Sequence, residues 1–369
     1  MSSIKITNIT NRTGDSGAIV SGIATASGSF KPPSGTPEQR VGIESGSLRY
    51  NTNDRSLEFY NGTSWRTIGP TTTIAFARGV FGGGANPGAT NTIDYITIAS
   101  TGNATDFGDL TVARSSLAAC SSSTRGVFGG GSPGPVTNTI DYITIATIGD
   151  ATDFGDLTVA RRDLAACSSS TRGVFGGGFT PTPVSTQLNV IDYITIASVG
   201  NAIDFGDLTV ARRNISACSS STRGVFGGGY IGSPLFANQN IIDYITIASV
   251  GNATDFGDLT VARGALAACS SSTRGVFGGG NPGVNTIDYI TIASTGDATD
   301  FGDLTTGNSN LAACSSITRG VFGGGGAPGN TNAIEYITIA SVGNALDFGD
   351  LTAERNSLAA TSNNHGGLS

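Results

Sequence analysis

The segment RGVFGGG occurs six times in this chain of 369 residues, and that repetition limits the possible fold more than any other feature. Each copy is followed by IDYITIA or IEYITIA and then by DFGDLT, and successive copies start 45 to 51 residues apart. This period is about the length of one four-stranded blade of a β-propeller. The copies start at Arg78, Arg125, Arg172, Arg223, Arg274 and Arg319. We therefore expect an all-β protein with a six-bladed propeller.

The composition agrees with this fold class and argues against membrane insertion. The chain has 55 glycines, only 13% charged residues, one Met, one His and one Trp, which suits tight strands and turns better than helices. No apolar run approaches the roughly 18 residues of a membrane-spanning helix. The first residues, MSSIKITNIT, have no basic stretch leading into an apolar one, so we expect no secretory signal.

The charge distribution argues against nucleic acid as a partner. Residues 71–369 carry 13 Lys and Arg against 22 Asp and Glu. A phosphate-binding surface needs clustered basic groups, whereas these arginines stand alone in an acidic background.

The residues before the repeats form a separate region. Residues 1–40 read as an extended attachment segment that ends in a Pro-rich linker at 31–40. Residues 41–70 alternate apolar and polar positions around turn residues and predict a small β-hairpin module, with Trp65 as a core anchor rather than a ligand platform. Residues 71–369 form the propeller.

Each repeat contains four predicted strands. In one copy these are residues 164–170, 172–177, 190–197 and 202–210, and the third has apolar residues on both faces, as a strand packed between neighbouring sheets requires. The last LAA segment, residues 358–362, follows the sixth DFGDLT. We expect it to supply the innermost strand of the first blade and so to close the ring.

The glycine cluster after the second strand and the acidic-Tyr third strand resemble the kelch-type propeller repeat. The chain departs from that pattern because Phe stands where kelch repeats usually have Trp in the fourth strand. These residues are Phe107, Phe154, Phe205, Phe256, Phe301 and Phe348. We expect Phe to fill the same space between blades.

The five cysteines occupy one position of the repeat, where the sixth copy has Thr361. An odd number does not make a disulfide framework, and the close spacing of a zinc site is absent. We interpret them as small, buried, reduced side chains of a protein assembled in a cytoplasm. They are Cys120, Cys167, Cys218, Cys269 and Cys314.

The sequence offers little material for catalysis, and we expect no enzyme, no catalytic residue, no cofactor and no metal site. The only histidine, His365, lies in a polar tail, and GVFGGG lacks the helix and the GK dipeptide of a phosphate loop. The row Asp150, Asp153 and Asp156 could offer oxygen donors to calcium but lacks the pattern of a dedicated loop, so a solvated turn is favoured. The Arg of RGVF and the Asp of IDY could pair between strands at the surface, where such pairs contribute about 0–1 kcal/mol.

The copies differ mainly between GGG and IDY, in loops that emerge on one face of a propeller beside the connections from fourth to first strands. Two adjacent copies have the longest loops and carry the aromatic residues Phe179, Tyr230 and Phe236. Binding usually resides where loops vary on a constant scaffold, although tolerated drift would also vary them. We therefore expect these three residues to form a ligand- or receptor-binding face.

Most of the chain resembles virion structural proteins of tailed phages that infect marine cyanobacteria. The resemblance rests on VSGIAT, PPSGTPEQR, the R-Y-N-T to W module in residues 49–65 and the repeats. It implies a tail-fibre or tail- or baseplate-associated protein, assembled in the host cytoplasm, oligomeric in the virion and mounted on other virion proteins through residues 1–70. The propeller would bind a host-surface glycan or protein; the alternative is a decoration or connector that binds only virion proteins.

Overall fold

The chain divides into two compact units, Met1–Ala75 and Phe76–Ser369, each described here by itself. A computed structural model describes residues 34–36, 47–52, 56–68, 77–181, 184–232, 237–326 and 328–368. Within these ranges the regular structure is β-strand, apart from the short 3-10 helix η2 (Gly366–Leu368). The all-β prediction is confirmed. The predicted boundary between residues 70 and 71 lies outside the described ranges.

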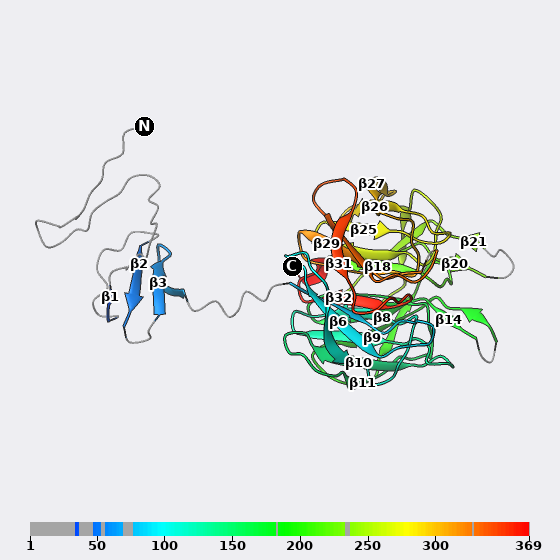
Figure 1. Ribbon diagram of the computed structural model, residues 1–369, viewed down its shortest axis with the longest axis horizontal. Helices are drawn as coiled ribbons and strands as arrows, with labels where there is room; N and C mark the ends of the chain where they lie inside the picture. The colour runs from blue at the N-terminus through cyan, green and yellow to red at the C-terminus, as the bar shows by residue number, and fades with distance from the viewer. Residues whose placement is uncertain are drawn as a thin grey trace, which may run out of the picture. The chain divides into compact units, whose positions relative to one another are not determined.

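The described part of the unit Phe76–Ser369 contains six four-stranded antiparallel sheets in a β-propeller-like arrangement (Figure 1). We number them 1 to 6 by the order of their RGVF strands. The first strands of sheets 1 to 6 are β32 (Ala359–Ser362), β8 (Ala118–Ser121), β12 (Ala165–Ser168), β18 (Ser216–Ser219), β24 (Ala267–Ser270) and β28 (Ala312–Ser315). The second strands are β5 (Arg78–Gly82), β9 (Arg125–Gly129), β13 (Arg172–Gly176), β19 (Arg223–Gly227), β25 (Arg274–Gly278) and β29 (Arg319–Gly323).

The third and fourth strands complete each sheet in the predicted order. The third strands are β6 (Thr92–Thr97), β10 (Thr139–Thr144), β16 (Val190–Thr195), β22 (Ile241–Thr246), β26 (Thr286–Thr291) and β30 (Ala333–Thr338). The fourth strands are β7 (Thr105–Asp109), β11 (Thr152–Asp156), β17 (Ile203–Asp207), β23 (Thr254–Asp258), β27 (Thr299–Asp303) and β31 (Leu346–Asp350). The four strands predicted in residues 164–210 are therefore confirmed, each with slightly shorter bounds.

The core lies between neighbouring sheets, as the two apolar faces of the third strand predict. In sheet 3, Val174 and Phe205 are at most 2% exposed and pack against Phe226 of sheet 4. The Phe205 ring meets Tyr193 edge to face, with 5.9 Å between ring centroids. Phe205 thus fills the space between sheets that we expected it to fill in place of the Trp of kelch repeats.

The C-terminal strand closes the ring. Strand β32 pairs antiparallel with β5, with Ala359 opposite Gly82 and Ser362 opposite Gly79, so the predicted closure is confirmed. Inside the ring, the hydroxyl of Ser168 donates to the carbonyl of Ser121 at 2.8 Å. The same bond joins each first strand to its neighbour, through Ser121, Ser168, Ser219, Ser270, Ser315 and Ser362. These hydroxyls form a closed cycle.

The glycine cluster lets neighbouring sheets approach closely and turns the chain into the following loop. A Cβ on Gly176 would lie 2.7 Å from the ring of Phe226 in the next sheet, so only glycine permits this approach. Gly177 follows with a φ of 66°, a left-handed conformation that turns the chain into the loop.

The cysteines are buried free thiols, as predicted. The Sγ of Cys167 in sheet 3 lies 2.6 Å from where a Cβ on Gly224 of sheet 4 would stand. Burial raises the pKa of Cys120 and of Cys218 to about 12. A thiol with so high a pKa is a poor nucleophile and metal ligand at neutral pH.

The expected surface pairing of the RGVF arginine with the IDY aspartate is wrong. Arg172 donates from Nη1 to the carbonyl of Ile247 in the next sheet at 2.8 Å, and its guanidinium lies 4.3 Å from the ring centroid of Tyr193. Asp192 instead pairs with Arg161, with 3.0 Å between Nη2 and Oδ2 and both side chains 0% exposed. The partner of the aspartate is therefore the arginine of the TVAR segment, residues 158–161 in this copy, which follows the fourth strand. Its side chain enters between two sheets.

The described residues of the unit Met1–Ala75 form one sheet with the strand order β1 (Ser34–Gly35), β2 (Leu48–Asn51), β3 (Ser56–Tyr60) and β4 (Trp65–Ile68). The segment predicted as a linker therefore contributes a strand, because Ser34 pairs in parallel with Tyr50. Trp65 is half-buried, and its ring centroid lies 5.6 Å from that of Tyr60.

Candidate binding face

The loops between second and third strands share one face of the ring with the connections from fourth to first strands. Isolated β-bridges join the two kinds of segment, including Arg162 with Phe179 and Arg213 with Tyr230. We call this side the loop face. Its composition varies between copies, whereas the strands beneath it hardly change.

Two extra hairpins rise from sheets 3 and 4 on this face. They are β14 (Phe179–Thr180) with β15 (Thr186–Gln187), and β20 (Tyr230–Ile231) with β21 (Ala237–Asn238). Figure 1 shows β14, β20 and β21 extending from the same side of the unit. A Cβ on Gly232 would lie 2.5 Å from the side chain of Gln187, so the hairpins touch.

Alternating arginine and aromatic side chains hold the bases of these hairpins together. The guanidinium of Arg213 lies 4.5 Å from the ring centroid of Phe179 and 5.2 Å from that of Tyr230. Arg162 lies over the other end of the row, 5.5 Å from Phe179. We call these four residues the hairpin ledge. Stacked guanidinium groups of this kind stabilise by about 0.5–2 kcal/mol each.

The structure differs from our expectation at one of the predicted site residues. Phe179 is only 8% exposed and belongs to the base of the ledge, because Arg213 covers its ring. Tyr230 is half-buried, and Phe236 lies outside the described residues. Among the described residues of the first hairpin loop the most exposed apolar side chain is Val184, which is 69% exposed and was not among our candidates.

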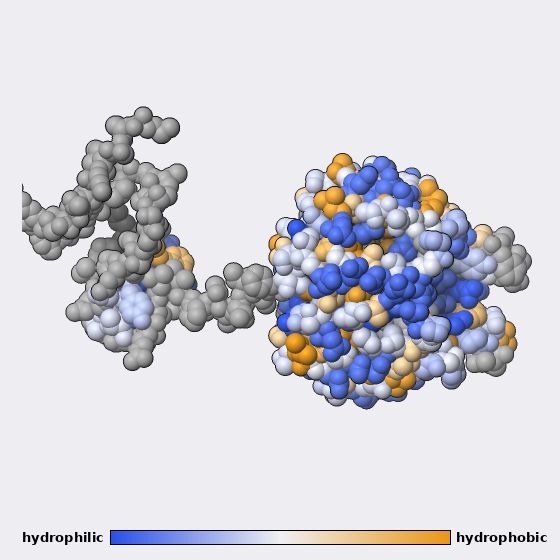
Figure 2. All heavy atoms as spheres, in the orientation of Figure 1, coloured by the Kyte–Doolittle hydropathy of each residue, from blue (hydrophilic) through white to orange (hydrophobic). Residues whose placement is uncertain are grey.

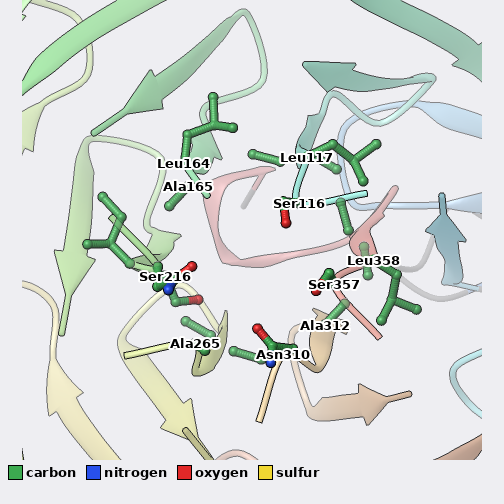
Figure 3. A pocket seen from close by; sticks show the side chains of 18 of the residues that line it. Ser116, Leu117, Leu164, Ala165, Ser216, Ala265, Asn310, Ala312, Ser357 and Leu358 are labelled. Carbon is green, nitrogen blue, oxygen red and sulfur yellow. The ribbon is translucent and has the colours of Figure 1, made fainter. Parts of the chain in front are cut away.

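A pocket of about 120 Å³ opens at the centre of the ring, where the first strands begin. One residue from each connection has a φ of 53° to 59°, and the backbone N–H of each donates to the carbonyl of the neighbouring connection. These six residues are Ser116, Asp163, Asn214, Ala265, Asn310 and Ser357. In Figure 3 the polar ends of Ser116 and Asn310 point toward the centre, and Leu117, Leu164 and Leu358 point away.

The six residues at the mouth of this pocket form its rim. The rim includes one carboxylate. Burial raises the pKa of Asp163, while a hydrogen bond from Ser116 and the nearby charges of Arg162 and Arg213 oppose that rise. Arg162 Nε lies 3.6 Å from Asp163 Oδ2, which links the rim to the hairpin ledge. Together they offer hydroxyl, amide, carboxylate and guanidinium groups beside aromatic rings, the mixture that suits a polar, hydroxylated ligand.

The opposite end of the central channel is occupied by the C-terminal tail. His365, which the sequence places in a polar tail, lies against the cycle of serines, with Nε2 3.4 Å from the carbonyl of Ser121. Its Nδ1 accepts from the N–H of Gly367 at 3.1 Å. Burial lowers the pKa of His365 to about 4, and the contact with Ser121 only partly opposes this.

Of the aspartates weighed as calcium ligands, Asp150 serves as a hydrogen-bond acceptor between neighbouring sheets. Asp150 Oδ1 accepts from the N–H of Asp109 at 3.0 Å, and Asn201 Oδ1 accepts from Asp156 in the same way in the next copy. Among the described residues no three His, Cys, Asp or Glu side chains are grouped to hold a metal ion. The described residues also contain no helix with the length and apolarity needed to cross a bilayer. Figure 2 shows a largely hydrophilic surface with scattered apolar residues on the visible face.

Comparisons with known proteins support the fold alone. No family model and no curated protein matches the chain. Among solved structures, one titled "Structure of YjhT" is similar with a TM-score of 0.57 and 9% sequence identity over 68% of this chain and 88% of that one. At this identity the likeness supports a β-propeller-like architecture.

Proposed function

We propose that this protein is a virion component of a tailed phage, in the tail fibre or associated with the tail or baseplate. It is mounted through residues 1–70 and contacts the host surface with the loop face of a six-bladed, kelch-like β-propeller. The six four-stranded sheets are the blades in this proposal. The resemblance of the repeats and of residues 41–69 to phage virion proteins supports the setting.

One observation carries the binding role. Sheets 3 and 4 alone bear paired hairpins above their second and third strands, within the described residues. These two hairpins touch each other and form a raised surface on an otherwise constant scaffold. The adjoining rim of the central pocket supplies polar groups. Arginines and aromatic rings there offer a large contact area to a glycan or a protein.

Mounting through the first unit is supported by an apolar face on its sheet. Leu48, Tyr50 and Phe59 are 44%, 37% and 36% exposed. Exposed apolar side chains grouped on one sheet face are typical of protein contacts.

The test replaces both long loops, residues 179–190 and 230–241, with NPGVNT from sheet 5. We expect virions with these replacements to assemble normally and to adsorb to host cells at least tenfold less. The matched control makes the same replacement in residues 132–139 of sheet 2, where no hairpin stands, and should leave adsorption unchanged. Normal adsorption of the first variant would refute host binding and favour the connector alternative. Failed assembly would show that the loop face meets another virion protein.

A further inference from the structure

Five of the six junctions between described sheets contain a buried guanidinium held by three acceptors. Between sheets 2 and 3, Arg161 Nη2 donates to Asp192 Oδ2 at 3.0 Å and to the carbonyl of Phe175 at 3.2 Å. Nη1 donates to the carbonyl of Val190 at 3.3 Å. The same arrangement recurs around Arg114, Arg212, Arg263 and Arg355.

The junction of sheets 5 and 6 has the acceptors without the arginine. Asn308 stands at the arginine position, as one backbone hydrogen bond shows. The N–H of Gly280 donates to the backbone carbonyl of Asn308 at 2.8 Å, and the N–H of Gly178 donates to the backbone carbonyl of Arg212 at 3.0 Å in the equivalent place. The Asn308 side chain turns aside and donates to the carbonyl of Gly324 at 2.8 Å. It therefore leaves the position of the guanidinium vacant.

Glu335 replaces the aspartate at this junction. Its Oε2 accepts from Thr305 N at 2.9 Å, as the Asp192 carboxylate accepts from Thr158 N at 3.2 Å. The five aspartates are 0% exposed, whereas Glu335 is half-buried. Among the described residues, no Lys, Arg or His forms an ion pair with Glu335.

A cavity of about 280 Å³ occupies this place. Its lining includes Asn308, Glu335, and Phe322 and Ala333, whose counterparts in the other sheets supply the two carbonyl acceptors. Leu304 and Leu311 add an apolar wall. An engineered cavity of about 150 Å³ binds benzene, so this volume is ample for a planar guanidinium and part of its stem.

The geometry points to a binding site for a guanidinium group supplied from outside the chain, at the junction of sheets 5 and 6. The carboxylate of Glu335 and the carbonyls of Phe322 and Ala333 form the acceptor set that the other five junctions use for arginine. A planar guanidinium has several donors in a fixed fork, whereas an ammonium is a compact and strongly hydrated charge. The site therefore selects arginine over lysine and is separate from the hairpin ledge.

The test titrates purified full-length protein with argininamide and, as the matched ligand, lysinamide, using calorimetry at low millimolar concentrations. We expect argininamide to bind at least tenfold more tightly than lysinamide. Glu335→Gln should weaken argininamide binding at least tenfold. The double variant Asn308→Arg with Glu335→Asp recreates the pair of the other junctions and should abolish binding, with melting temperature confirming that both variants fold.

Asn308→Ala serves as the control, because it keeps Glu335 and should bind argininamide at least as tightly as the unmodified chain. Equal affinity for the two amides, or binding that survives the double variant, overturns the proposal. A Gly-Arg-Gly peptide separates two sources of the group. Tighter binding of the peptide indicates an arginine of a partner protein, and binding of argininamide alone indicates a small guanidinium compound.

Discussion

The arginine of each TVAR segment is the single residue that most clearly ties one sheet to the next. Arg161 is fully buried and satisfies a carboxylate and two carbonyls at once. Burying both charges is costly, so the pair adds little net stability over an apolar contact, but removing one partner leaves the other charge uncompensated.

Arg161→Ala is therefore expected to lower the free energy of unfolding by about 3–5 kcal/mol, because Asp192 loses its counter-charge in a buried place. Asn308→Ala, at the equivalent position without an ion pair, should cost less, about 1–3 kcal/mol, because its side chain makes two neutral hydrogen bonds, to the carbonyl of Gly324 and from the N–H of Ser309. Urea denaturation of both variants measures the difference. Equal losses would show that the ion pair has no special role at the junction.

The sequence held a signal for these pairs that we did not use. The repeat with Glu335 in place of aspartate directly follows the repeat with Asn308 in place of arginine. Changes at both positions in two consecutive copies indicate contact between the arginine of one repeat and the aspartate of the next. We instead paired the aspartate with the RGVF arginine of the adjacent strand. The register of strands within one sheet does not show which side chain of the neighbouring sheet enters between the two.

At the scale of elements, the strands were predictable and the loops were not. Alternation and repetition located the four strands of each repeat and the closing strand β32, since both depend on pattern. The burial of Phe179 depends on Arg213 from a different connection, which no local pattern reveals. The tail has no apolar periodicity that would locate it, and its position depends on a close fit: a Cβ on Gly366 would clash with the carbonyl of Ser271.

The tail should make stability depend on pH through His365. Its pKa is lowered to about 4 in the folded chain, so the unfolded chain binds the proton first, from about pH 6.5 downward. Stability is therefore lost as pH falls from about 6.5 toward 4, by at most about 1.4 kcal/mol per pH unit. Urea denaturation at pH 7 and pH 5 should show about 2 kcal/mol more loss for the unmodified chain than for His365→Asn. The same loss in both proteins would mean that the tail does not stay in the channel.

At the scale of the whole molecule, the closed ring makes each junction depend on the other five. Closure was predictable because the count of repeated segments required it, and the hydrogen-bond cycles through the serines and through the rim show how each first strand holds its neighbours. Cavities were not predictable, since they depend on side chains from two sheets. The junction of sheets 5 and 6, with its cavity and without an ion pair, interrupts an otherwise uniform ring.

That junction should open first under mild denaturing conditions, because local opening begins where packing is poorest. The Sγ of Cys269 reports on it, since it lies 2.6 Å from where a Cβ on Gly320 of sheet 6 would stand, and its pKa is raised well above normal by burial. In urea below the unfolding midpoint, we expect alkylation followed by mass spectrometry to label Cys269 before the other four thiols. The double variant Asn308→Arg with Glu335→Asp should slow its labelling to the rate of Cys218, whose junction has an ion pair. Simultaneous labelling of all five thiols in the unmodified chain would instead mean that the ring unfolds as one cooperative unit, in which the missing pair creates no weak junction.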